Sequence, residues 1–256
     1  MTEPEEPLYG GLENARVFRV GDTVRRPAGT WTPTVQALLA HLQTKGFPSP
    51  KPLGLDDKGR EIVSYLPGHA GLWPWPRPLL ATQGARDVGA MLRAYHDAVA
   101  DFVPPAPAIW RHGPQALAPG EIALHGDFGP YNLLWDGDRL SAVIDFEMAR
   151  PGQPIEDAVI CVQRVACLRP DALAMNAGYG APPDRRARLR AFAAGYGCVP
   201  DDLVSRVIAG QRDELDRMLR FGSAGMEPWA GYLRRGLEPR AREELAWLEA
   251  NIGNLT

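Results

Sequence analysis

Three side chains within residues 122–147 are of the types that hold a metal ion and accept a proton. Asp127 follows a short apolar run, Asn132 comes five residues later, and Asp145 ends a further apolar run. Carboxylate and amide oxygens are ligands that Mg²⁺ prefers, and this ion usually takes only one or two carboxylates from a protein. Another carboxylate that is not a ligand can orient or deprotonate an attacking hydroxyl. A single loop aspartate usually only caps a turn, but the three residues at this spacing favour a phosphoryl-transfer site.

The sequence between Asn132 and Asp145 predicts a β-hairpin with a connection of common length. If Trp135 faces Leu140 across the turn, Asn132 faces Val143. Asp145 then lies on the same face, because side chains alternate along a strand. Asn132 and Asp145 are therefore expected as a diagonal pair roughly 7–8 Å apart, at the end of the hairpin where the loop with Asp127 enters.

The string His-Gly-Asp-x-x-x-x-Asn, from His125 to Asn132, is followed by an apolar strand and by Ile-Asp-Phe-Glu, which ends at Glu147. This pattern resembles the aminoglycoside phosphotransferase and choline kinase group, whose members share a two-lobed protein-kinase-like fold. The resemblance is sharp over about residues 122–158 and diffuse elsewhere. It implies an α+β protein with a small β-rich lobe and a larger, mainly α lobe.

The resemblance also implies a role for each matching residue. Asp127 would be the catalytic base, and Asn132 and Asp145 would hold Mg²⁺, with ATP or GTP as the phosphoryl donor. Asp157 matches the aspartate that opens the following helix and braces the catalytic loop in the family. His125 is interpreted as structural support that fixes the same loop by hydrogen bonding.

The first quarter of the chain predicts a small sheet with one helix, which we assign to a nucleotide-binding lobe over residues 1–66. A hairpin is expected around Gly21, a helix with Thr32 as its N-cap follows, and two strands are expected over 52–55 and 61–66. Residues 67–256 are assigned to the helical lobe. Its helices are expected over 79–102, 155–168, 184–197, 201–221 and 239–251.

The predicted small lobe departs from the family pattern at the nucleotide site. Where the family normally carries a lysine on its third strand, Arg25 aligns best, and an arginine can hold phosphate bidentately. The helix over 33–45 contains no Asp or Glu, so the usual glutamate partner of that cation is absent. Gly10–Asn14 forms either a turn over phosphates or an ordinary turn. Tyr65 and Leu66 fit a hinge whose backbone amides would take an adenine edge.

The acceptor site is expected in the helical lobe, where the sequence leaves alternatives open. Asp213 and Asp216 either line a cationic pocket or form a solvated helix face. Trp110 either stacks on the acceptor or fills the gap between the lobes, and Glu147 is a further candidate. From residue 171 onward there are twelve acidic and twelve basic residues, so the charge balance does not indicate a trough for a polycation.

Three functional hypotheses follow. The leading one is an ATP- and Mg²⁺-dependent phosphotransferase that acts on a hydroxyl of a small molecule, with an aminoglycoside-like antibiotic as one candidate acceptor. The alternative is a kinase-shaped binding or immunity protein that sequesters a small molecule or toxin, which the missing lysine and glutamate favour. A metal-dependent phosphohydrolase would leave the small lobe and the hinge without a purpose.

The composition excludes several other classes of partner. The net charge is −3, so no basic field favours nucleic acid or an anionic membrane. No run approaches the 18 apolar residues of a membrane helix, and the first residues are acidic rather than signal-like. Cys161, Cys167 and Cys198 match no zinc spacing and are expected as reduced thiols. We therefore expect a cytoplasmic protein, and its oligomeric state stays open.

Overall fold

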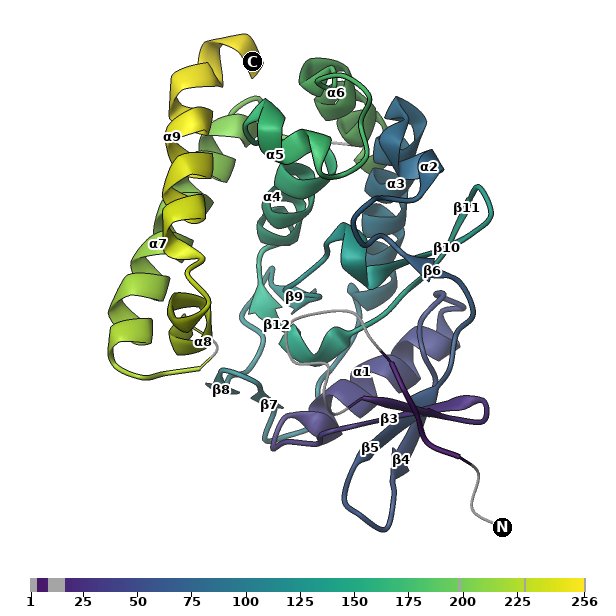
Figure 1. Ribbon diagram of the computed structural model, residues 1–256. Helices are drawn as coiled ribbons and strands as arrows, with labels where there is room; N and C mark the ends of the chain where they lie inside the picture. Colours follow the sequence, from purple (N-terminus) through teal and green to yellow (C-terminus); the bar gives the residue numbers. More distant parts are fainter. Residues whose placement is uncertain (1–3, 9–16, 198, 228, 256) are drawn as a thin grey trace.

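The computed structural model describes residues 4–8, 17–197, 199–227 and 229–255. It has an α+β architecture in which a small sheet with one helix precedes a larger, mainly helical part (Figure 1). The predicted boundary after residue 66 falls between strands that belong to different sheets. The division into two lobes at that residue stays a prediction.

The N-terminal part is an antiparallel sheet in the order β1-β2-β3-β5-β4, with helix α1 packed beside it. Its elements are β1 (Glu6–Pro7), β2 (Phe18–Val20), β3 (Thr23–Arg26), α1 (Thr32–Thr44), β4 (Pro52–Leu55) and β5 (Glu61–Ser64). The predicted hairpin forms at Gly21, whose φ of +56° suits glycine. The N-cap of α1 is Trp31 and not Thr32, because the Thr32 hydroxyl instead accepts the Gly29 N–H at 2.9 Å.

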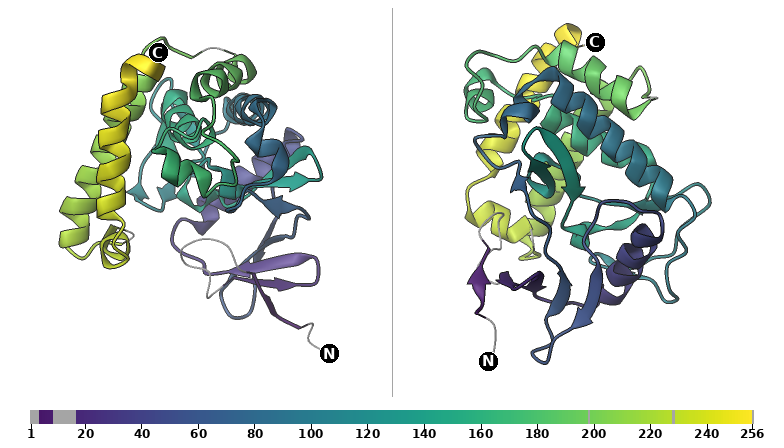
Figure 2. Two further views of the ribbon diagram at one scale, coloured as in Figure 1. Left: turned by 45° about the horizontal axis from the view of Figure 1, so that its top comes forward. Right: turned by 90° about the vertical axis from the view of Figure 1, so that its right-hand side faces the viewer.

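The larger part begins with short strands and two helices and ends with a helical bundle. Its elements are β6 (His69–Ala70), α2 (Arg77–Leu80), α3 (Thr82–Val99), β7 (Ile109–Trp110), β8 (Gly113–Pro114), β9 (Ile122–Leu124), η2 (Pro130–Asn132), β10 (Leu133–Asp136), β11 (Arg139–Val143), η3 (Phe146–Met148), β12 (Arg150–Gly152), α4 (Pro154–Val165), α5 (Asp171–Met175), α6 (Arg185–Tyr196), α7 (Leu203–Ser223), α8 (Trp229–Arg234) and α9 (Glu238–Leu255). Helices α7 and α9 lie side by side in every view (Figure 2).

Helices α3 and α6 pack with their backbones in contact. A Cβ at Gly89 would stand 2.4 Å from the carbonyl oxygen of Phe192, and one at Gly195 would stand 2.0 Å from that of Arg86. Both positions therefore need glycine, since the two backbones touch there. This contact places α3 against the hydrophobic core that supports β9 and α4.

The hairpin of β10 and β11 pairs Trp135 with Leu140, as predicted. A β-bulge at Ser141 on β11, which has no partner between Leu134 and Trp135, shifts the register by one residue, so that Leu133 faces Val143. The predicted pairing of Asn132 with Val143 is therefore wrong, because a bulge adds a residue to one strand only. Asn132 lies before the strand, in the short helix η2.

The helix predicted over 79–102 is two helices, α2 and α3, separated by Ala81 in an extended conformation. Arg188, which is 1% exposed, stabilises this break from α6. Its guanidinium makes five hydrogen bonds of 2.7–3.0 Å to the carbonyls of Leu79, Leu80, Ala81 and Val165. One side chain thus satisfies the free carbonyls of α2 and of the end of α4.

Among the residues that the structure describes, no helix combines the length and the apolar character needed to cross a membrane.

Replacing Arg188 by methionine should lower the free energy of unfolding by about 2–4 kcal/mol, because several buried carbonyls lose their donors at once. The measurement is urea denaturation followed by circular dichroism. Arg190→Met is the matched control, since Arg190 is exposed on the same helix, and it should change stability little. Equal effects of the two substitutions would show that the buried network does not stabilise the fold.

Candidate active site

The loop after β9 is held by a single buried carboxylate. Asp157, in the first turns of α4, is 0% exposed. Its Oδ2 accepts the backbone N–H of His125 at 2.8 Å, and its Oδ1 accepts that of Gly126 at 2.9 Å. Gly126 has a φ of +79°, and a Cβ there would meet the carbonyl oxygen of Met148 at 2.1 Å. The loop can therefore take this shape only with glycine at that position.

His125 joins the same loop to the strand that precedes Asp145. Its Nδ1 accepts the backbone N–H of Asp127 at 3.3 Å, which requires that nitrogen to be unprotonated. Its Nε2 lies 3.0 Å from the carbonyl oxygen of Ile144 and can therefore donate to it. The ring is 0% exposed and packs against Phe128 and Phe146. His125 thus has a supporting position without access to a substrate.

Asp127 projects from this loop and is held by two neighbours on η2. The hydroxyl of Tyr131 donates to its Oδ1, and Nδ2 of Asn132 donates to its Oδ2 at 3.1 Å and to its carbonyl oxygen at 2.9 Å. Burial raises the pKa of Asp127, while the charge of Arg164 and the hydrogen bond from Tyr131 oppose this shift. A raised pKa suits a carboxylate that must accept a proton near neutral pH.

Asp145 directly follows β11 and stands in the left-handed region, with φ +66° and ψ +63°. Few non-glycine residues adopt this conformation, and such positions concentrate at functional sites. The backbone N–H of Ile144 donates to the carbonyl of Asn132 at 2.9 Å, so the two predicted ligands lie on neighbouring segments. The negative charge of Asp145 also contributes to the raised pKa of Asp127. The structure therefore brings Asp127, Asn132 and Asp145 into one region.

Arg26, at the end of β3, connects the small sheet to this region. It donates to Asp145 Oδ1 at 2.9 Å, across 119 residues of sequence, and to Glu61 Oε2 at 2.5 Å. Burial alone would lower the pKa of Arg26, but the charges of Glu61 and Asp145 outweigh it and raise the pKa. Arg26 is therefore a permanent positive charge beside the predicted metal ligand.

Glu61 supplies the carboxylate that α1 lacks. It lies on β5, is 2% exposed, and accepts from Nε2 of Gln36 on α1 at 2.9 Å as well as from Arg26. Helix α1 thus contributes the amide of Gln36, and strand β5 contributes the negative charge of Glu61. The sequence signal for Glu61 was an acidic residue at the start of a strand that continues with Ile62 and Val63, and alternation along β3 separates Arg26 from Arg25.

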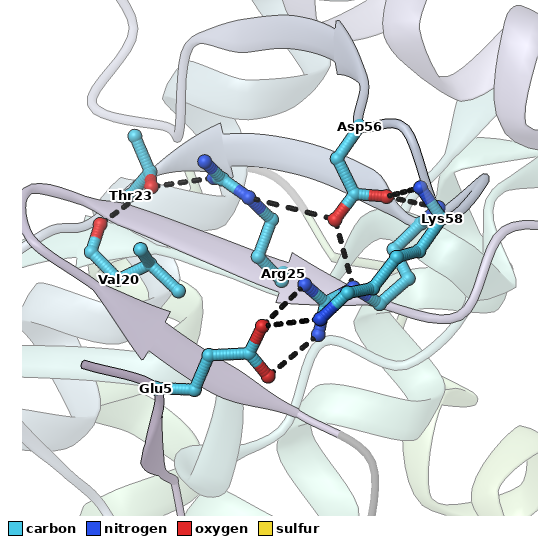
Figure 3. Close-up of polar contacts among 7 residues, drawn as sticks. Glu5, Val20, Thr23, Arg25, Asp56 and Lys58 are labelled. Atoms are coloured by element: carbon cyan, nitrogen blue, oxygen red, sulfur yellow. Dashed lines mark hydrogen bonds and ion pairs between the residues drawn. The ribbon is translucent and has the colours of Figure 1, made fainter. Parts of the chain in front are cut away.

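Arg25, the residue before Arg26 on β3, takes part in a separate polar network (Figure 3). Its guanidinium donates to the hydroxyl of Thr23 at 2.5 Å and lies 3.8 Å from Asp56, in a surface network with Glu5 and Lys58. The cation that reaches Asp145 is therefore Arg26 and not Arg25, the residue that the sequence predicted. The difference arises because adjacent strand residues face opposite ways.

The hinge residues Tyr65 and Leu66 follow β5 and are half-buried. The backbone N–H of Tyr65 donates to the carbonyl of Asp22 at 2.8 Å, and its ring lies 4.0 Å from the guanidinium carbon of Arg19. That amide is therefore already used, and an adenine edge would depend on other hinge groups. Gly10–Asn14, the candidate phosphate loop, lies outside the described residues, as does Cys198.

The predicted acceptor residues have different environments. Trp110 is 1% exposed and donates its indole N–H to the carbonyl of Gln115, so it belongs to the core and not to an acceptor surface. Glu147 forms an ion pair of 2.9 Å with Arg111. Asp213 and Asp216 are exposed and line a surface depression along α7. Their role as acceptor ligands stays a prediction.

The donor atoms fit a magnesium ion better than a softer metal. Nδ2 of Asn132 faces Asp127, which leaves its amide oxygen as a ligand, and the carboxylate of Asp145 is 45% exposed. Within the described ranges, no group of three or more His, Cys, Asp or Glu side chains could hold a metal. A site with two protein oxygens, completed by water and phosphate, is the kind that Mg²⁺ uses.

The fold resembles solved phosphotransferases over nearly the whole chain. The GDP complex of wild-type aminoglycoside 2'-phosphotransferase-IIIa aligns with 98% of this chain and 94% of that chain, with a TM-score of 0.58 and 16% identity. A choline/ethanolamine kinase family protein from Mesorhizobium loti aligns with 96% of this chain and 92% of that chain, with a TM-score of 0.57 and 17% identity. The two-lobed kinase-like fold is thereby confirmed.

Sequence relatives identify the family. The profile of the "Phosphotransferase enzyme family" matches residues 106–192. The trifolitoxin immunity protein of Rhizobium leguminosarum bv. trifolii is 35% identical over 202 residues, which cover 75% of this chain and 74% of that protein. A homoserine kinase of Nitrobacter hamburgensis is 31% identical over 183 residues, which cover 54% of this chain and 53% of that protein. The chain belongs to the phosphotransferase enzyme family.

Asp157→Asn should destabilise the protein by about 2–3 kcal/mol at neutral pH, because a buried amide replaces an acceptor-only carboxylate. Burial raises the pKa of Asp157, but hydrogen bonds from His96 and from the backbone N–H of Gly126 lower it overall. Because the folded-state pKa is lowered, the stabilisation is present above the unfolded value near 3.8 and is lost as the pH falls through the folded value.

The difference between wild type and Asp157→Asn should therefore shrink when urea denaturation is repeated at pH 3. Asp97→Asn, an exposed change on α3, serves as the control and should show little effect at either pH. A difference that does not depend on pH would contradict the assigned role of the charge.

Proposed function

We propose that the protein transfers a phosphoryl group from ATP or GTP to a hydroxyl of a small molecule, in the presence of Mg²⁺. The observation that carries this proposal is the convergence of Asp127, Asn132 and Asp145, with Arg26 reaching Asp145 from the small sheet. Family membership and the nucleotide-bound state of a similar fold, described as a GDP complex, support it. The free, buried thiols of Cys161 and Cys167 support a cytoplasmic location.

In this mechanism the residues of the chain position the groups and handle one proton. Asn132 and Asp145 would hold Mg²⁺, which when bound neutralises charge on the phosphate oxygens. Arg26 adds a fixed positive charge on the small-lobe side and is itself held by Glu61. Asp127 orients the acceptor hydroxyl and takes its proton, while Tyr131 and Asn132 fix the rotamer of Asp127. His125 and Asp157 keep the loop in place.

Asp127→Asn should reduce phosphoryl transfer by about 10²–10⁴-fold, the usual contribution of a positioned acid–base group, while leaving the melting temperature nearly unchanged. Turnover is measured by mass spectrometry of an acceptor panel incubated with protein, ATP and Mg²⁺. Asp97→Asn, an exposed change on α3, is the control and should leave turnover unchanged. Full activity of Asp127→Asn would rule out Asp127 as the base.

Arg26→Gln should weaken the binding of Mg²⁺–ATP by tenfold or more, since charge-assisted hydrogen bonds to phosphate are among the strong ones. Arg25→Gln is the matched control, because it lies on the same strand and faces away. The double substitution Arg26→Gln with Glu61→Gln removes the carboxylate that would otherwise remain buried and unpaired. Dissociation constants come from calorimetry. A larger effect of Arg25→Gln would restore the sequence-based assignment.

A second candidate function is sequestration of a small molecule or toxin without phosphoryl transfer. The observation that favours it is the similarity to the trifolitoxin immunity protein, together with the hydrogen bond by which Tyr131 already occupies Asp127. The two functions differ in their dependence on nucleotide. A ligand that binds equally well with and without ATP and Mg²⁺, and that never gains a phosphoryl group, would support sequestration.

A further inference from the structure

Arg164 is a cation close to Asp127 that the proposed mechanism does not use. It lies in the last turn of α4, and its guanidinium carbon stands 5.3 Å from the centre of the Tyr131 ring. Tyr131 in turn donates its hydroxyl to Asp127. Its neighbours Tyr131 and Asp127 raise the pKa of Arg164 against the effect of burial. Tyr131 therefore lies between the positive charge of Arg164 and the proposed base, Asp127.

The donor groups of this cation are not fully used within the described part of the chain. Nε of Arg164 is buried and has no hydrogen-bond partner there, and the same is true of Nε of Arg169, five residues later. Arg169 is 5% exposed, and its ion pair with Glu244 is long, at 3.9 Å. Glu244 is more closely bonded to Arg240, at 3.0 Å. Buried donors without acceptors are unfavourable, so an anion at this position would be stabilising.

The other carboxylates around this position are already engaged. Glu214, whose charge acts on both Arg164 and Tyr232, accepts a hydrogen bond from Arg217 at 3.0 Å. Asp127 accepts from Tyr131 and an amide, and not from Arg164. An acceptor molecule rich in ammonium groups would be repelled by the guanidinium groups of Arg164 and Arg169 here. A carboxylate would instead find the planar donors that match its geometry.

We propose that the acceptor carries a carboxylate, which binds Arg164 with the assistance of Arg169, while its hydroxyl lies at Asp127. Only the placement of the hydroxyl at Asp127 rests on the proposed function, because the carboxylate would bind Arg164 whether or not phosphate is transferred. It describes the acceptor as a short hydroxycarboxylate, since Arg164 and Asp127 contact the same tyrosine side chain. It also argues against a polycationic aminoglycoside as the acceptor.

The test uses three matched sets of compounds: short ω-hydroxycarboxylates, the amides of the same acids, and amino alcohols of the same chain length. Binding is measured by calorimetry and thermal shift with the full-length protein, and phosphoryl transfer is measured by mass spectrometry with ATP and Mg²⁺. Wild type should prefer the carboxylates by about tenfold or more. Arg164→Gln should abolish this preference, Arg164→Lys should retain part of it, and the exposed control Arg190→Gln should leave it unchanged.

The thermal shift caused by Mg²⁺–ATP serves as the folding control for each variant and should be the same in all of them. Equal binding of amides or amines, a preference that survives Arg164→Gln, or binding of no carboxylate at all would overturn the inference. Weaker nucleotide binding in a folded Arg164→Gln protein would also overturn it, by assigning the cation to the nucleotide. Carboxylate binding that depends on Arg164 but occurs without transfer would sustain the inference and refute the proposed function.

Discussion

The buried carboxylate of Asp157 is the interaction on which the rest of the site depends. It accepts the two successive backbone N–H groups of His125 and Gly126, and its Oδ2 also lies 3.4 Å from Nε2 of His96. A carboxylate can accept several hydrogen bonds and cannot donate while ionised, so it suits a turn with two amides pointing inward. Because that turn is held from α4, Asp127 leaves it in a defined direction.

A second constraint joins the two parts of the chain. Arg26 contacts Glu61 within the small sheet and Asp145 in the larger part, so one guanidinium sets the distance between a β-strand and the end of a hairpin. The conformation of Asp145, with its positive φ, turns the carboxylate toward that guanidinium. A site assembled from two parts requires a contact of this kind between them. The guanidinium of Arg26 makes that contact, and it also carries a positive charge beside Asp145.

Much of the fold could be predicted from local patterns. The apolar spacing of Val35, Leu38, Leu39 and Leu42 marked α1, and each of these side chains is at most 1% exposed. The break at Ala81 could not be predicted, because it depends on Arg188, more than a hundred residues away. The bulge in β11 could not be predicted either, since one extra residue in a strand leaves the apolar pattern almost unchanged.

The sequence by itself determined which residues are available for chemistry: the spacing of Asp127 and Asn132, the strand before Asp145, and the resemblance of this segment to a phosphotransferase family. These features are local, so composition and order along the chain were sufficient. Only the tertiary structure decided that Arg26 rather than Arg25 reaches Asp145, that Glu61 replaces a helix glutamate, and that Trp110 is buried. Each of these depends on which face of a strand or loop meets a distant segment, and the packing of the whole chain sets that choice.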